Sequence, residues 1–167
     1  MSHAINHSVL DAAHAAFIQH RVTMNVAARN ASLITTITRA LGCRVSDDRR
    51  RITVFLPVER CQTLLDNLRV NGAIAVVAVR PSTHESIQLK GADAVIGPLQ
   101  QGDDALMTAH LEQFVADLCS IGYTEAFARM VIPNRSGEIV AVTFTPLAVF
   151  QQTPGPEAGR RLESPAP

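Results

Sequence analysis

The stretch that decides the fold is DNLRVNGAIAVVAVRPSTHESIQLKG, residues 66–91. Its Asn71-Gly72 pair predicts the end of a helix, because glycine readily adopts the left-handed backbone that stops one. The nearly unbroken apolar run that follows, residues 73–79, predicts a buried strand. A Pro-Ser-Thr turn then leads into residues 84–96, which predict a long strand with a bulge or bend at Gly91. Two strands joined by so short a turn predict an antiparallel pair.

Working outward, hydrophobic periodicity and turn residues predict the remaining elements. We expect helices over 8–20, 58–70, 104–120 and 124–130, and strands over 21–28, 32–41, 42–46, 51–56 and 139–145. Ser8 is the expected cap of the first helix and Pro57 the expected opening of the second. Short turns between successive strands favour antiparallel pairing, and closure into a barrel would protect the strand edges. Beyond Phe150 the chain is rich in Pro and Gly, so we expect no regular structure there.

Composition limits the classes of protein to consider. The 167 residues are 47% hydrophobic, which suits one domain with a substantial core. Fifteen basic residues balance fifteen acidic ones and only 4% are aromatic, so we expect no nucleic-acid partner. No apolar run is long enough to span a membrane, and the first residues do not resemble a signal peptide. Three widely spaced cysteines without a CxxC pair are typical of free thiols, so we expect a cytoplasmic protein.

The densest polar chemistry lies in the predicted strand over 84–96. His84, Ser86, Gln88 and Lys90 would share one face of it, because side chains alternate along a strand. Lys90 is also the single lysine among fifteen basic residues. Such a polar face fits either ordinary solvated surface or the lining of a ligand site or interface, and periodicity alone leaves both readings open.

A second polar strip lies in the predicted strand over 32–41. Thr36 and Thr38 fall on one face and Arg39 on the other. Threonine is a common strand former, whereas the planar guanidinium of Arg39 would suit a phosphate group. The sequence has no motif of a P-loop, a Rossmann fold or an α/β-hydrolase. Its six histidines lack metal-ligand spacing, so we expect no metal site.

The run RPSTHESIQLKG, preceded by DNLRVNGAIAVVAV, resembles the FMN-binding split-barrel family related to pyridoxamine 5′-phosphate oxidase. The order of the predicted elements supports the resemblance over roughly residues 8–98. It implies an α+β fold, a mostly antiparallel split β-barrel with flanking helices. One FMN-binding domain would occupy residues 1–150, followed by a Pro/Gly-rich C-terminal tail over 151–167. The resemblance also implies a homodimer with FMN at the subunit interface, contacted by both chains.

Carried over by position, the resemblance implies cofactor-binding roles for a set of polar residues on four segments. They are Thr36, Thr38, Arg39, Arg60, Ser82, Thr83, His84, Ser86, Gln88 and Lys90. Threonine and arginine would bind the phosphate, and amide and ammonium groups would bind the flavin ring. The oxidase itself carries a basic cluster at the start of its middle helix, where this chain reads VERCQT and offers Arg60 alone. The residues with which the oxidase binds pyridoxal phosphate are not recognisable, so we expect no vitamin B6 oxidase.

Three functions remain open on the sequence. The first is an FMN-dependent oxidoreductase of unassigned substrate, for which no catalytic side chain is needed because a flavin carries the chemistry. The second is a non-catalytic flavin- or haem-binding protein, with His84 or a residue of the tail as the haem ligand. The third is a dimeric interaction module without a cofactor.

Overall fold

The computed structural model describes residues 10–133 and 135–162. Within these ranges the chain forms two antiparallel sheets and four α-helices. The expected α+β class is therefore confirmed, and every strand pair is antiparallel as predicted. Strand pairing does not close the two sheets into a barrel in the described part of the chain.

The larger sheet has six strands in the order β10-β9-β6-β5-β1-β2. These strands are β1 (Thr23–Arg29), β2 (Thr35–Arg39), β5 (Ile74–Val79), β6 (Ser86–Gly91), β9 (Ala148–Gln151) and β10 (Arg161–Leu162). Alternate residues of β1 and β5 are buried, as a strand with only one face on the core requires. This alternation gives the sheet an inner face on the core and an outer face pointing away from it.

The smaller sheet has four strands in the order β3-β4-β8-β7. These strands are β3 (Cys43–Val45), β4 (Ile52–Pro57), β8 (Ile139–Phe144) and β7 (Val95–Gly97). All six residues of β4 are buried, so this strand lies at the centre of the molecule. The main core lies between the two sheets and includes Val26, Val76, Leu89, Val142 and Phe144.

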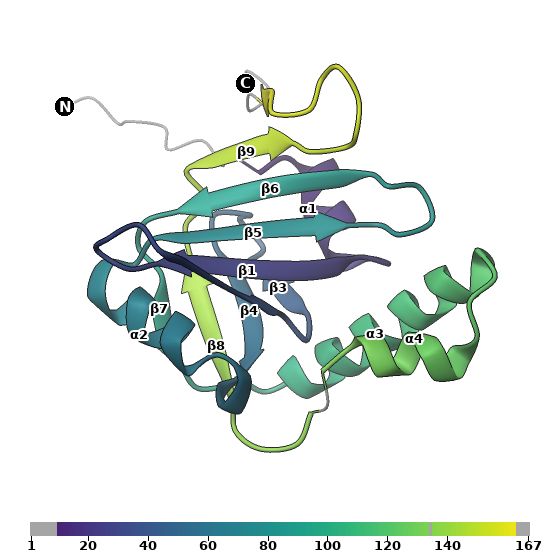
Figure 1. Ribbon diagram of the computed structural model, residues 1–167, viewed down its shortest axis with the longest axis horizontal. Helices are drawn as coiled ribbons and strands as arrows, with labels where there is room; N and C mark the ends of the chain where they lie inside the picture. Colours follow the sequence, from purple (N-terminus) through teal and green to yellow (C-terminus); the bar gives the residue numbers. More distant parts are fainter. Residues whose placement is uncertain (1–9, 134, 163–167) are drawn as a thin grey trace.

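The helices lie around the sheets rather than over the outer face. They are α1 (Ala12–Gln19), α2 (Gln62–Asn71), α3 (Asp103–Ser120) and α4 (Glu125–Val131), and a short 3-10 helix, η1 (Val58–Arg60), precedes α2. Figure 1 shows β1, β5 and β6 with no helix in front of them, and α3 and α4 projecting to one side. A second hydrophobic cluster, which includes Phe55, Phe114 and Leu118, joins α3 to the smaller sheet. No helix of the described residues is long and apolar enough to cross a membrane.

Two expected helix starts differ from the structure. The carboxylate of Asp11 caps α1 by accepting a hydrogen bond from the His14 amide, and the expected cap Ser8 lies outside the described residues. Pro57 belongs to β4 and is followed by η1, so α2 begins at Gln62 rather than directly after the proline. This delay puts the side chain of Arg60 in the turn before α2.

The predicted single strand over 84–96 is wrong. It divides into β6 and β7, which belong to different sheets, and the Ala94 amide donates to the Gly72 carbonyl between them. His84 is not in the strand, because it lies in the preceding turn with φ of 59°. The expectation that the chain beyond Phe150 lacks regular structure is also wrong, since Gln151 ends β9 and β10 pairs with that strand.

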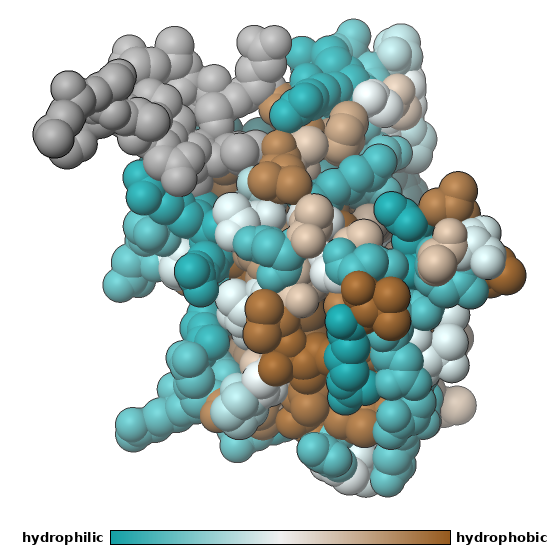
Figure 2. Space-filling model, turned by 90° about the vertical axis from the view of Figure 1, so that its left-hand side faces the viewer, coloured by the Kyte–Doolittle hydropathy of each residue, from teal (hydrophilic) through white to brown (hydrophobic). Residues whose placement is uncertain are grey.

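One end of the molecule carries exposed hydrophobic side chains. Figure 2 views the end at which β5 begins and β6 ends, and shows hydrophobic side chains gathered among hydrophilic ones. Leu33 and Ile34, in the β1–β2 turn, and Val70, near the end of α2, are all more than half exposed at 67%, 64% and 73%. This end of the molecule therefore combines exposed apolar side chains with hydrophilic ones (Figure 2).

Candidate functional site

A pocket between β2 and the start of α2 brings together two of the residues singled out in the sequence. It has a volume of about 400 Å³ and contains both Thr36 and Arg60 among its lining residues. Gln62 and Thr63, from the first turn of α2, line it as well. Arg60, Gln62 and Thr63 belong to the segment VERCQT, in which Arg60 was the expected basic residue.

The start of α2 is suited to an anion. No side chain caps this end of the helix, and the first amide to bond back along the chain is that of Leu65, which donates to the Cys61 carbonyl. The backbone N–H groups of a helix's first turn and the helix dipole both attract negative charge. Polar Gln62 and Thr63 add donors at the same place.

Arg60 supplies the positive charge of this pocket. Its side chain is exposed and forms no ion pair with any part of the chain that the structure describes. The neighbouring Glu59 lies close to Gly137, since a Cβ built on that glycine would come within 2.8 Å of a Glu59 carboxylate oxygen. The nearby Cys61 thiol donates to the Pro57 carbonyl, and burial raises its pKa to about 11. Cys61 is therefore a neutral lining group rather than a nucleophile.

Thr36 is held in place from both sides. Its hydroxyl accepts from the Asn67 amide of α2 at 3.2 Å and donates to the Ala28 carbonyl at 3.4 Å. Thr38 lies on the same face of β2, because the two residues are two positions apart. Asn67, Gln62 and Thr63 are polar groups of this region that the sequence analysis did not select. The absence of a capping residue before Gln62 was the signal that could have found the last two.

Arg39 points to the opposite face of β2. One of its Nη atoms donates to the Val131 carbonyl at the end of α4, at 2.8 Å. Burial lowers the pKa of Arg39, though a guanidinium stays charged at neutral pH. A cation at a helix C-terminus also stabilises the helix dipole. Arg39 thus ties α4 to β2 and is not among the residues lining the pocket at the start of α2.

Ser86, Gln88 and Lys90 lie on the outer face of the six-stranded sheet. Four residues form a row across this face, one on each of four neighbouring strands. They are Gln88 on β6, Val77 on β5, Asn25 on β1 and Arg39 on β2. Three strand spacings separate Arg39 from Gln88, which is roughly 14 Å. The alternation predicted for Ser86, Gln88 and Lys90 is confirmed, whereas His84 is not part of it.

Lys90 is exposed at one end of this outer face. Its ammonium lies 4.9 Å from the centre of the Phe150 ring, in a cation–π contact. Small residues including Ala27, Ala75 and Gly91 form a hollow of about 270 Å³ beside it. The outer face therefore has a hollow lined by small residues, with the amide of Gln88 and the ammonium of Lys90 along β6.

Ser82 and Thr83 lie in the β5–β6 turn with His84, at the opposite end of β6 from Lys90. Asp117 of α3, which is 1% exposed, accepts from the Ser82 amide at 2.9 Å and from its hydroxyl at 2.7 Å. Thr83 accepts from the amide of Glu85 at 3.3 Å. This turn is bound to α3 within the chain, and the structure does not bring it to the pocket at the start of α2.

The structure thus divides the predicted set into three groups. Arg60 and Thr36 line the pocket at the start of α2, and Thr38 lies on the same face of β2 as Thr36. Four others lie on the outer face, namely Arg39, Ser86, Gln88 and Lys90. The turn residues Ser82, Thr83 and His84 lie at the far end of β6. Within the described ranges no group of three or more His, Cys, Asp or Glu side chains is placed to hold a metal ion.

Comparison with known proteins identifies the fold but no close relative. No family model and no curated protein sequence matches the chain. Among solved structures, HupZ of Group A Streptococcus is 16% identical over 90% of this chain and 99% of its own, with a TM-score of 0.52. An F420 reductase is 12% identical over 80% and 93%, with a TM-score of 0.51. A candidate pyridoxamine 5′-phosphate oxidase of Lactobacillus delbrueckii is 10% identical over 87% and 97%, also with a TM-score of 0.51.

These neighbours show which class of fold the chain adopts. General stress protein 26 of Bacillus anthracis, 11% identical over 89% of this chain and 94% of its own, also has this fold, with a TM-score of 0.50. The resemblance seen in RPSTHESIQLKG is therefore confirmed at the level of fold. The chain has the fold of the proteins related to pyridoxamine 5′-phosphate oxidase.

Proposed function

We propose that the chain is an FMN-binding split-barrel protein that works as a cytoplasmic homodimer and as a flavin-dependent oxidoreductase. In this proposal the two antiparallel sheets are the halves of the split barrel. The observation that carries it is the pocket at the start of α2, where Arg60 and Thr36 meet an uncapped helix end. The family resemblance implies a phosphate-binding role for both residues.

The donor set of this pocket fits the phosphate end of FMN. Arg60 is charged and unpaired among the described residues, the first amides of α2 face a region without a capping side chain, and Thr36 and Gln62 add polar groups. Arginine and helix N-terminal amides are the groups that proteins use to bind phosphate. We propose that Arg60, Gln62 and Thr63 hold the phosphate, while Thr36, whose hydroxyl proton is donated to the Ala28 carbonyl, lines the pocket.

A second copy of the chain would complete the site. Gln88 and Lys90 lie three strands away from β2 on the outer face, and neither lines the pocket that contains Arg60. Small apolar residues such as Ala27 and Ala75 lie in the middle of the outer face, and no helix lies in front of β1, β5 and β6, which suits a two-fold interface (Figure 1). We propose that the partner's outer face brings Gln88 and Lys90 to the flavin ring.

The proposed roles of the protein are binding and electrostatics. Bound FMN would supply the electron transfer, as flavins do in oxidoreductases. The positive charge of Lys90 would favour a negatively charged form of the ring, and Gln88 would hydrogen-bond its polar edge. Thr38 and Ser86, on the same strands, would support these contacts. The proposal gives Arg39 and the turn residues Ser82, Thr83 and His84 no direct part.

Titration of the purified protein with FMN tests this proposal. We expect quenching of flavin fluorescence with one FMN per chain, and Arg60→Gln should weaken binding by about tenfold to a hundredfold, because a charge-assisted contact to phosphate is lost. Arg51→Gln, which removes the same charge from the β3–β4 turn, is the matched control and should bind as the wild type does. Failure of the wild-type protein to bind FMN would contradict the proposal.

The same preparation distinguishes the other two functions. A Soret band on titration with haem that is absent in His84→Ala would favour the haem-binding alternative, since His84 lies exposed in the β5–β6 turn. A dimer that binds neither FMN nor haem would favour the interaction module.

A further inference from the structure

We infer that a second cavity, between η1 and the α3–α4 pair, binds a small apolar ligand that carries one negative charge. It has a volume of about 430 Å³, within the range of small-molecule sites of roughly 300–1,000 Å³. Arg60 lines both this cavity and the pocket at the start of α2, so the two adjoin. The inference goes beyond the proposed function, because a ligand of this cavity, called the chamber below, would compete with the FMN phosphate for Arg60.

Apolar side chains form one part of the wall of this chamber, and three arginines form the rest. Leu111 of α3 and the residues at the end of α4, including Met130, Ile132 and Pro133, form the apolar part. Ile132 is 7% exposed and belongs to the second hydrophobic cluster, so this part of the wall is anchored in the core. Apolar ligands gain affinity from burial against such surfaces.

Two of the three arginines that line the chamber already have carboxylate partners. Arg129 uses Nη1 and Nη2 on Glu112, both at 2.9 Å, and Nε on Glu125 at 2.8 Å. Glu112 and then Glu125 raise the pKa of Arg129, as expected for a saturated cation. Arg135 bonds Asp104 and Thr108 of α3 at 2.8 and 2.7 Å.

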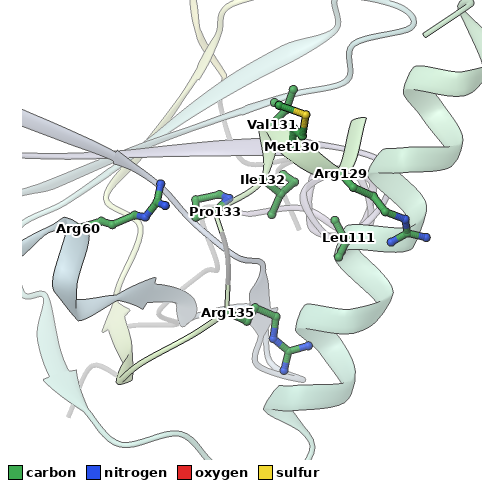
Figure 3. A pocket seen from close by; sticks show the side chains of 8 residues that line it. All are labelled: Arg60, Leu111, Arg129, Met130, Val131, Ile132, Pro133 and Arg135. Atoms are coloured by element: carbon green, nitrogen blue, oxygen red, sulfur yellow. The ribbon is translucent and has the colours of Figure 1, made fainter. Parts of the chain in front are cut away.

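Arg60 differs from Arg129 and Arg135 in the direction of its side chain and in the lack of a carboxylate partner among the described residues. Figure 3 shows its guanidinium extending toward Pro133, whereas those of Arg129 and Arg135 point to α3. It has no carboxylate partner in the described ranges, so it leaves one uncompensated positive charge beside an apolar wall. A monocarboxylate would match this charge.

The chamber is less suited to a phosphorylated ligand than the pocket at the start of α2. Within the described residues its lining includes no helix N-terminus, so the second charge of a phosphate monoester would be moved out of water without a partner, which is unfavourable. The carboxylates of Asp104, Glu112 and Glu125 behind the other arginines would repel it further. The ligand class is therefore an aromatic or aliphatic monocarboxylate with an apolar body of one or two rings.

Isothermal titration calorimetry with 2-naphthoate and 2-naphthyl phosphate, with and without added FMN, tests the inference. We expect one 2-naphthoate per chain, bound about tenfold more tightly than the phosphate ester. Leu111→Ala should weaken 2-naphthoate about fivefold by removing apolar contact. Met130→Ser, whose site is 84% exposed and safe for folding, should weaken it in the same direction. Arg60→Gln should weaken it about tenfold, and Arg51→Gln should leave it unchanged.

The outcomes separate this inference from the proposed function. Binding of 2-naphthoate that is lost in Leu111→Ala and Met130→Ser supports the chamber even if FMN does not bind, a result that would contradict only the proposed function. Tight FMN binding without 2-naphthoate binding would overturn the chamber alone. Tighter binding of the phosphate ester, or affinity for 2-naphthoate that none of the chamber variants changes, would overturn it as well.

Discussion

His110 shows what burial does to a single ionisable residue. It lies on α3 with 4% of its surface exposed, and its Nε2 has no hydrogen-bond partner in the described parts of the chain. Its ring packs on Gly42, where a Cβ would come within 3.2 Å of the Cβ of His110. Burial lowers the pKa of His110 to about 4. The imidazole is therefore neutral in the folded protein at neutral pH.

We expect His110 to make the folded protein sensitive to acid. Its folded pKa lies below its unfolded value of about 6.5, so unfolding takes up a proton between these pH values. The contribution of neutral His110 to the free energy of unfolding is fully present above about pH 6.5, and it falls by about 3 kcal/mol as the pH approaches 4. Urea denaturation of the wild type and of His110→Leu over this pH range compares how their free energies of unfolding depend on pH.

The matched control is His20→Gln, which removes an exposed histidine at the end of α1. It should keep the pH dependence of the wild type, while His110→Leu should lose the part between pH 6.5 and 4. An unchanged pH dependence in His110→Leu would show that the imidazole is not the responsible group.

At the scale of elements, the junction of β6 with the smaller sheet depends on the lack of a side chain at Gly91. Gly91 ends β6 and pairs with Ile74 of β5. A Cβ there would come within 2.6 Å of Cδ2 of Phe144, and Phe144 is only 1% exposed in the core. The chain leaves the larger sheet directly after this contact and enters β7.

Gly91→Ala should therefore destabilise the protein by about 1–3 kcal/mol, because the core must shift to accept a methyl group. Gly97→Ala is the matched control, since a Cβ at Gly97 would meet nothing within 4 Å. It should change the free energy of unfolding by less than about 0.5 kcal/mol. The midpoints of urea denaturation compare the two variants, and equal midpoints would refute the steric account.

At the scale of the whole molecule, the uncovered outer face predicts self-association. Ile37 projects from this face on β2 and is 69% exposed. Ile37→Glu would place a charge in the proposed two-fold interface, so the variant should be a monomer where the wild type is a dimer. Sedimentation equilibrium measures the oligomeric state of the wild type and of the Ile37→Glu variant.

Val70→Glu is the control for this experiment. Val70 is 73% exposed but lies on α2 rather than on the outer face, so the variant should remain a dimer. A wild-type monomer at tens of micromolar, or a dimer that survives Ile37→Glu, would contradict the proposed interface.

Much of the fold could be predicted because local patterns carry it. The helix expected over 104–120 is α3 (Asp103–Ser120), and the strand expected over 73–79 is β5 (Ile74–Val79). Both follow from periodicity and from turn residues within the segment itself. The antiparallel pairing followed from turns too short for crossover connections.

The site was predictable only in part. Gln88 and Lys90 share a face because alternation depends on positions within one strand, whereas Arg60 and Thr36 come from different segments and only the family resemblance implied a shared site for them. That Arg39 would bind the end of α4, and that Asp117 would hold Ser82, depended on contacts between segments far apart in the chain. No pattern within one segment records such contacts.

The sequence by itself determined the α+β class, most elements, the antiparallel pairing and the resemblance carried by RPSTHESIQLKG. Only the tertiary structure decided where residues 84–96 divide between two sheets, that residues 148–151 and 161–162 extend the larger sheet, and that the ten selected residues form separate groups. The reason is physical. Alternation and helical periodicity are properties of consecutive residues, whereas the partner of each face is chosen by burial across the whole chain.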